Sequence, residues 1–152
     1  MKRDLHFEMT YAHAPEHVWK ALITSAAMAQ WLMPNNFLPV LGHRFQFHTK
    51  PAPGFDGIVQ CEVLEIVPLQ RLVYTWVGGG IDTKLTWTLE QVVGGTKVTL
   101  DHTGFEGLRG MFVSGILNKG WRSRILSIHL PALLDRWSGT GPVPSAADAP
   151  PE

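Results

Sequence analysis

The sequence predicts an α+β fold in which a six-stranded antiparallel sheet packs against one long C-terminal helix. Two observations carry most of this prediction. Hydrophobic and polar residues alternate in several segments that are separated by short turn sequences, which is typical of antiparallel strands. Near the C-terminus, hydrophobic residues instead recur at helical spacing and form a stripe so broad that it needs the face of a sheet to cover it.

The composition indicates one globular domain without a charged partner. The chain has 152 residues, of which 45% are hydrophobic, and its thirteen basic residues balance its thirteen acidic ones. Nucleic acid is not an expected partner, because phosphate binding depends on clustered Lys and Arg. No apolar run is long enough for a membrane span, so no membrane partner is expected. Without a secretory signal pattern, and with Cys61 as its lone cysteine, the chain is expected to be cytoplasmic.

The N-terminal part predicts one strand and then two short helices. Residues 5–11 alternate between hydrophobic and polar side chains, as a half-buried strand does. Pro15 suits the first turn of a helix, and hydrophobic residues at helical spacing follow it. Thr24 or Ser25 can cap a second short helix over residues 26–31.

Five more strands are expected, each ending at turn-forming residues. Because the connections between them are short, neighbouring strands have to be antiparallel. The expected strands span residues 44–48, 57–67, 71–77, 81–90 and 96–103.

One face of this sheet carries most of its hydrophobic side chains. Trp87 shares a face with Leu85 in one strand, and His102 shares a face with Leu100 in the next. Cys61 also falls on the hydrophobic side of its strand. We expect this face to meet the last helix.

The C-terminal part predicts a loop, a long helix and a tail. Residues 104–110 contain three glycines and are expected to form an irregular loop before the helix. The helical pattern runs from Met111 to about Trp137, and Pro131 should kink it near Ser127 by removing a backbone hydrogen bond. Gly, Pro, Ala and Ser dominate the final segment, so the chain is expected to divide into a domain over residues 1–137 and a disordered tail over 138–152.

Six short patterns occur in a fixed order along the chain. They are residues 14–22 (APEHVWKAL), 31–34 (WLMP), 71–76 (RLVYTW), 95–100 (GTKVTL), 102–105 (HTGF) and 120–121 (GW). Together they resemble the AHSA1-like family, which is related to the activator of the Hsp90 ATPase and belongs to the SRPBCC superfamily of polyketide cyclases, START domains and Bet v 1. The resemblance covers about residues 5–137. It implies a helix-grip fold, in which a curved sheet wraps around the C-terminal helix and often leaves a cavity between them.

The resemblance implies a range of functions. Relatives include a co-chaperone domain, proteins that bind lipids or hydrophobic natural products, and cyclases, so the function has to be argued from the site. The eukaryotic co-chaperone has a separate N-terminal Hsp90-binding domain for which this chain has no room, and direct Hsp90 binding is therefore not expected. A homodimer through an exposed strand or helix stays open, although a closed meander would leave few free edges.

We predict that the chain binds a small hydrophobic or aromatic molecule between the sheet and the last helix, without necessarily transforming it. Aromatic side chains on both walls suit a pocket that is mostly apolar with few polar contacts. The expected lining is Trp31, Met33, Phe45, Phe47, Trp76, Trp87, His102, Phe105, Trp121 and Ile125. Trp87 and Trp121 should face each other, with Trp31 and Trp76 near the mouth. The alternative is that the aromatic side chains fill the core completely.

Two other functions compete with simple binding. A cyclase or lyase would use His102 as its acid–base group, whereas a histidine bonded within the protein would have only a structural role. A stress-response or chaperone-associated interaction domain is the second alternative. Cys61 lacks a neighbouring base and is expected to be a core residue. The seven histidines are scattered without metal-ligand spacing, so we expect no metal and no cofactor.

Overall fold

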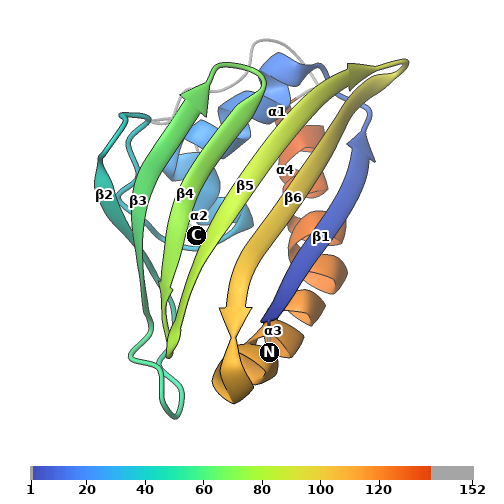
Figure 1. Ribbon diagram of the computed structural model, residues 1–152. Coiled ribbons are helices and arrows are strands. Elements are labelled where there is room, and N and C mark those ends of the chain that lie inside the picture. Colours follow the sequence, from blue (N-terminus) through green and yellow to red (C-terminus); the bar gives the residue numbers. More distant parts are fainter. Residues whose placement is uncertain (1, 138–152) are drawn as a thin grey trace.

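A curved six-stranded antiparallel sheet wraps around a long C-terminal helix in the computed structural model, which describes residues 2–137 (Figure 1). The expected tail over residues 138–152 lies outside the described residues. The elements are β1 (Lys2–Tyr11), α1 (Pro15–Ile23), α2 (Ser25–Trp31), β2 (Arg44–His48), β3 (Ile58–Val67), β4 (Arg71–Gly78), β5 (Ile81–Val92), β6 (Gly95–Glu106), α3 (Gly107–Gly120), η1 (Trp121–His129) and α4 (Leu130–Trp137). The predicted α+β order and the helix-grip fold are confirmed.

The strands are joined in the order β1-β6-β5-β4-β3-β2. Strands β2 to β6 form a meander, and β1 pairs antiparallel with β6, with Met9 opposite Val98. The sheet is open, so the expectation of a closed meander is wrong: β1 and β2 are edge strands, and a bridge between Asn35 and Phe47 covers part of β2. A homodimer stays a prediction. Within residues 2–137, no helix combines the length and the hydrophobicity that crossing a membrane requires.

The second short helix lacks the side-chain cap that the sequence predicts for it. Helix α1 begins at Pro15, as expected, and α2 begins at Ser25. Neither helix has a side-chain cap. The Ser25 hydroxyl instead donates to the side-chain and backbone oxygens of Asn35, at 2.8 and 3.1 Å, and so fixes the segment that follows α2.

The prediction of an irregular loop over residues 104–110 is wrong. Strand β6 runs to Glu106 and α3 begins directly at Gly107, so no flexible connection precedes the helix. Gly107 has a φ of +69°, which lets the chain turn sharply from strand to helix. A side chain at Gly110 would meet the backbone of Phe105 at 3.0 Å. These glycines therefore permit a tight strand–helix junction.

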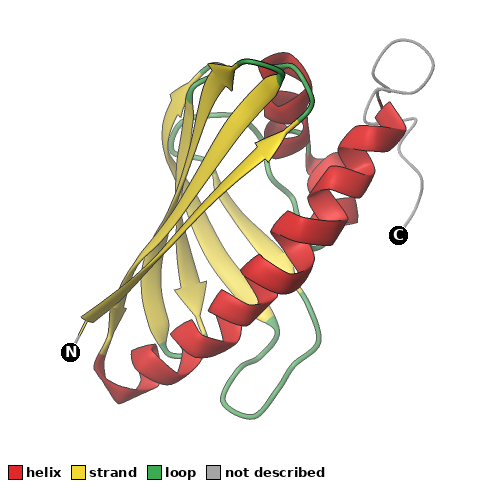
Figure 2. Cartoon of the chain, turned by 90° about the vertical axis from the view of Figure 1, so that its right-hand side faces the viewer, coloured by secondary structure: helices red, strands yellow, loops and turns green. Residues whose placement is uncertain are grey.

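The C-terminal helix runs without interruption from Gly107 to Trp137, as one rod along the sheet (Figure 2). Near Ser127, where the sequence predicts a kink, the structure has a π-helix: η1 has the wider i→i+5 ladder. The last amide of this ladder, from Leu130, donates to the carbonyl of Ile125. The next amide would be that of Pro131, which has no N–H, so the carbonyl of Leu126 lacks its partner. The Tyr11 hydroxyl of β1 donates to this carbonyl at 2.6 Å.

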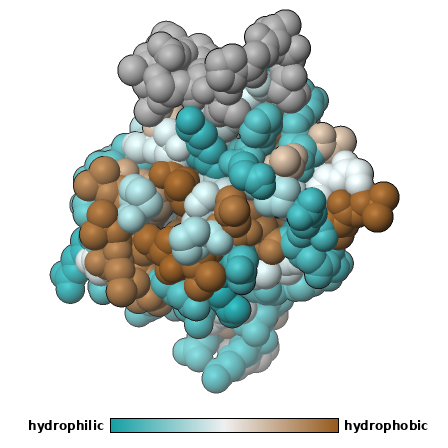
Figure 3. All heavy atoms as spheres, turned by 90° about the horizontal axis from the view of Figure 1, so that it is seen from above, coloured by the Kyte–Doolittle hydropathy of each residue, from teal (hydrophilic) through white to brown (hydrophobic). Residues whose placement is uncertain are grey.

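Hydrophobic side chains also gather on the outside of the molecule, on the side of β2, β3 and the connection before β2 (Figure 3). Backbone hydrogen bonds from Gly42 to Val63 and from Val63 to His43 hold this connection beside β3. The exposed hydrophobic residues of this region are Leu38, Val40, Leu41, Leu64 and Leu69.

The bond between Tyr11 and Leu126 leads to the first prediction. Tyr11→Phe should lower the free energy of unfolding by about 1–2 kcal/mol, since it leaves a buried carbonyl without a partner. Urea unfolding measures this change. In a Pro131→Ala background the new amide can supply the missing donor, so the same substitution should cost less there. An equal cost in both backgrounds would contradict the account.

Candidate ligand pocket

Aromatic side chains fill the middle of the interface between the sheet and the long helix. The rings of Trp87 and Trp121 meet edge to face with their centroids 5.9 Å apart, which confirms the expected pair. Trp31 packs against Trp87 at 5.5 Å, and its indole N–H donates to the carbonyl of Ala21. Trp31 therefore lies in the core and not at a mouth.

A second aromatic cluster extends this solid region toward β2. Phe45 contacts Phe47 and Tyr74 with ring centroids 5.4 and 5.3 Å apart, respectively. The Tyr74 hydroxyl accepts the indole N–H of Trp87 at 3.1 Å and so joins the two clusters. Burial raises the pKa of Tyr74, which is therefore a neutral core residue.

His102 is fully buried and faces the helix, as the strand parity predicts. The Trp121 indole can only donate, so at 3.2 Å the Nδ1 atom of His102 has to accept. Nε2 of the neutral ring then carries the proton and donates to the Thr83 hydroxyl at 2.7 Å. Thr83 in turn donates to the carbonyl of Trp76 at 2.7 Å. Both ring nitrogens of His102 are therefore engaged inside the protein.

The surroundings of His102 favour its neutral form. Burial lowers the pKa of His102 to about 3, so the ring stays uncharged near neutral pH. The ring of Phe105 lies 4.6 Å away and closes off one side. A neutral histidine with two occupied nitrogens offers no proton and no base to a ligand, and this geometry is that of a structural residue.

Cys61 does not suit nucleophilic chemistry. Its thiol is buried and donates to the carbonyl of Val59 at 3.8 Å, and burial raises its pKa. Among the residues that the structure describes, no three His, Cys, Asp or Glu side chains are grouped so that they could hold a metal ion.

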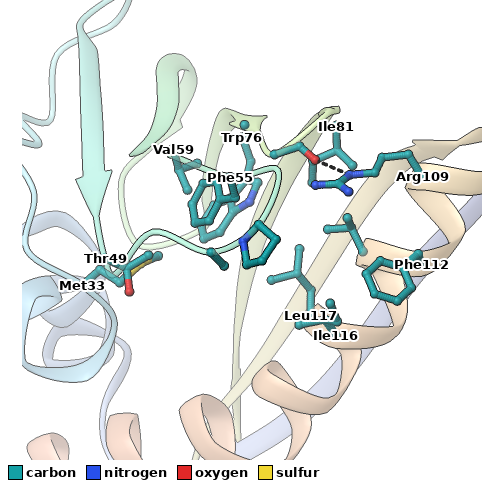
Figure 4. Close-up of a pocket in the computed structure, with 15 residues that line it drawn as sticks. Met33, Thr49, Phe55, Val59, Trp76, Ile81, Arg109, Phe112, Ile116 and Leu117 are labelled. Atoms are coloured by element: carbon teal, nitrogen blue, oxygen red, sulfur yellow. Dashed lines mark hydrogen bonds between the residues drawn. The ribbon is translucent and has the colours of Figure 1, made fainter. Parts of the chain in front are cut away.

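An apolar cavity of about 260 Å³ lies at one end of the interface, beyond the aromatic clusters. Its walls come from the start of the long helix, the connection between β2 and β3, and the turn between β4 and β5 (Figure 4). Side chains that form these walls include Phe55, Trp76, Ile81, Phe112, Val113 and Leu117.

Two of the ten residues expected to line a pocket lie here, namely Met33 and Trp76. The other eight lie outside its lining. Ile125 is partly buried and packs against the core, and the remaining seven are buried within it. A ligand-binding role for these eight residues stays a prediction from the sequence.

The structure adds lining residues that the sequence analysis does not propose. Phe112, Val113, Ile116 and Leu117 lie on the first turns of the long helix, within the segment that the sequence predicts to be helical from Met111. Phe55 comes from a segment that reads as a simple break between strands. The sequence does contain a pattern that could have identified the helical lining residues. Val113, Ile116 and Leu117 recur at helical spacing and continue the apolar stripe of the long helix toward its N-terminus.

Close backbone packing holds the mouth of the pocket together. The connection between β2 and β3 folds back on itself through paired hydrogen bonds between Ala52 and Phe55. The ring of Phe55 lies against the β4–β5 turn, where a side chain at Gly79 would meet it at 3.4 Å. Arg109 of α3 reaches across to both segments and donates to the carbonyl of Gly79 at 2.7 Å (Figure 4) and to that of Gly54 at 3.1 Å.

The curved sheet, the gripped helix and the apolar pocket at their open end define a helix-grip domain. The chain belongs to the family of Activator of Hsp90 ATPase homolog 1-like proteins, whose model matches residues 12–128. No curated protein matches the sequence.

Solved structures agree with this assignment. The MLL2253 protein of Mesorhizobium loti has 31% sequence identity and a TM-score of 0.79, over 88% of this chain and 98% of that one. The Aha1 dimer of Colwellia psychrerythraea has 18% identity and a TM-score of 0.70, over 84% of this chain and 93% of that one. CalU16 of Micromonospora echinospora has 19% identity and a TM-score of 0.69, over 88% of this chain and 74% of that one. The last two show the likeness of fold alone.

The buried state of His102 leads to the second prediction. An unfolded histidine takes up a proton near pH 6.5, whereas the folded chain resists this until about pH 3. Between these values the unfolded state binds more protons, so stability should fall as the pH falls, by up to about 1.4 kcal/mol per pH unit.

His102→Gln is the matched control for this measurement. Its amide can accept from Trp121 and donate to Thr83 but does not titrate. The difference between the two unfolding free energies should therefore shrink steadily as the pH falls from about 7 to about 4. A difference that is constant over this range would show that His102 does not resist protonation.

Proposed function

We propose that this chain binds a small hydrophobic or aromatic molecule in the pocket between α3, the β2–β3 connection and the β4–β5 turn. The apolar cavity of about 260 Å³ is the observation that carries the proposal. Ligand sites are typically concave and mostly apolar, with few polar groups. This volume is near the lower end of such sites, which are roughly 300–1,000 Å³, so the expected ligand is small.

The exposure of the pocket walls supports this proposal. Phe112 and Ile116 line the pocket, yet they are 66% and 57% exposed. Side chains of this size contribute about 1.5–3 kcal/mol each when they are fully buried, and here much of that contribution is not realised. A ligand seated against α3 would cover them. The aromatic rings of Phe55 and Trp76 on the opposite wall suit a flat apolar or aromatic body.

Binding accounts for the site better than catalysis by His102. That residue does not line the pocket, and its two nitrogens are occupied by Trp121 and Thr83. The pocket walls instead supply hydrophobic contact, which favours retention of a molecule over its transformation.

Filling the pocket tests the proposal. Val113 lies on the inner side of α3, and Val113→Trp would place an indole into the cavity. Isothermal titration with naphthalenemethanol, a neutral aromatic probe, should show that this variant binds at least about tenfold more weakly than the unchanged chain.

Leu108→Trp provides the matched control. Leu108 is on the same helix and highly exposed, and it does not line the pocket. This variant should bind the probe as tightly as the unchanged chain does. If Val113→Trp leaves the affinity of the chain for the probe unaltered, the pocket is not the binding site.

A further inference from the structure

Arg109 is the charged member of the pocket lining among the residues that the structure describes. The other lining residues are hydrophobic or small, apart from the hydroxyl of Thr49. The guanidinium of Arg109 lies at the mouth of the pocket, where Nε donates to the carbonyl of Gly79 and Nη2 donates to that of Gly54. Among the described residues that line the pocket, Arg109 is therefore the only cation, and two backbone segments hold it in one place.

Within residues 2–137, no acidic side chain is paired with the charge of Arg109. A guanidinium has five N–H groups, of which the two carbonyls take two. The other three are not used by any protein group in the described part of the chain.

The two loops are shaped around this side chain. A side chain at Gly54 would come within 2.7 Å of the Arg109 guanidinium, and one at Gly80 within 3.0 Å of the Arg109 stem. Glycines on both sides therefore make room for Arg109. Because the guanidinium is already positioned, a ligand that binds it has less side-chain freedom to remove, which favours binding.

We propose that the ligand of this pocket is a hydrophobic carboxylic acid, whose apolar body lies against α3 and whose carboxylate binds Arg109. This inference rests on the proposed function and adds the chemical class of the ligand. The fork of N–H groups on arginine matches the two oxygens of a carboxylate. A seated apolar body also excludes water from one side of the pair and so strengthens it. A cationic head group at the same place would be repelled.

Three probes with the same ring system and different head groups test this inference. They are naphthoate, naphthalenemethanol and naphthylmethylammonium, each titrated calorimetrically into the full chain at neutral pH. The unchanged chain should bind the carboxylate roughly five- to tenfold more tightly than the alcohol, and the ammonium most weakly. The preference for the carboxylate should decrease as the salt concentration rises from about 20 mM to about 500 mM.

Two variants locate the preference. Arg109→Met keeps an apolar stem but removes the charge, and it should bind the carboxylate no better than the alcohol. Lys119→Met removes a charge from the same helix at a residue outside the pocket lining, and it should keep the full preference. If the unchanged chain binds the alcohol and the carboxylate equally, or if the preference is insensitive to salt, the inference is wrong while the proposed function stands. If none of the three probes binds, the proposed function itself fails.

Discussion

The hydrogen bond between Trp121 and His102 is the contact on which the arrangement of sheet and helix depends. A buried indole needs an acceptor for its N–H, and the core offers His102 on the facing strand. This single demand sets the tautomer of the buried neutral ring and the donor role of Thr83 beside it. It also fixes how closely the helix approaches the sheet, so Trp87 can pack against Trp121. A polar contact thus organises an otherwise hydrophobic interface.

The aromatic packing at the centre of the sheet–helix interface explains why the cavity lies at one end of this interface. Large aromatic rings from both layers occupy the middle of the interface, where Trp87 and Trp121 pack against each other. At the open end the β2–β3 connection and the end of β4 bring small residues such as Ala52 and Gly78 beside the rings of Phe55 and Trp76. The space that remains there is bounded by the start of α3. The densely packed core and the cavity therefore occupy different regions of one interface.

Strand parity in the sequence is enough to predict the sheet, the buried face and the Trp87–Trp121 pair, because alternation directly reports which side of a strand is covered. The pocket is harder to predict, since it depends on where the long helix begins. Three glycines suggest a loop over residues 104–110, whereas Gly107 turns the chain at once into α3. Arg109 then sits on a helix over the pocket, and no local pattern shows that its partners are carbonyls of two distant loops.

The bond from Tyr11 to Leu126 joins residues 115 positions apart, and β1 finds its partner only in β6. During synthesis the first strand therefore emerges long before either the strand or the helix that it needs. Contacts so distant in sequence raise the relative contact order, which slows folding because a large loop has to close before any of them forms. Until β6 is made, β1 has no strand to pair with, and the Tyr11 hydroxyl finds its acceptor only when η1 follows.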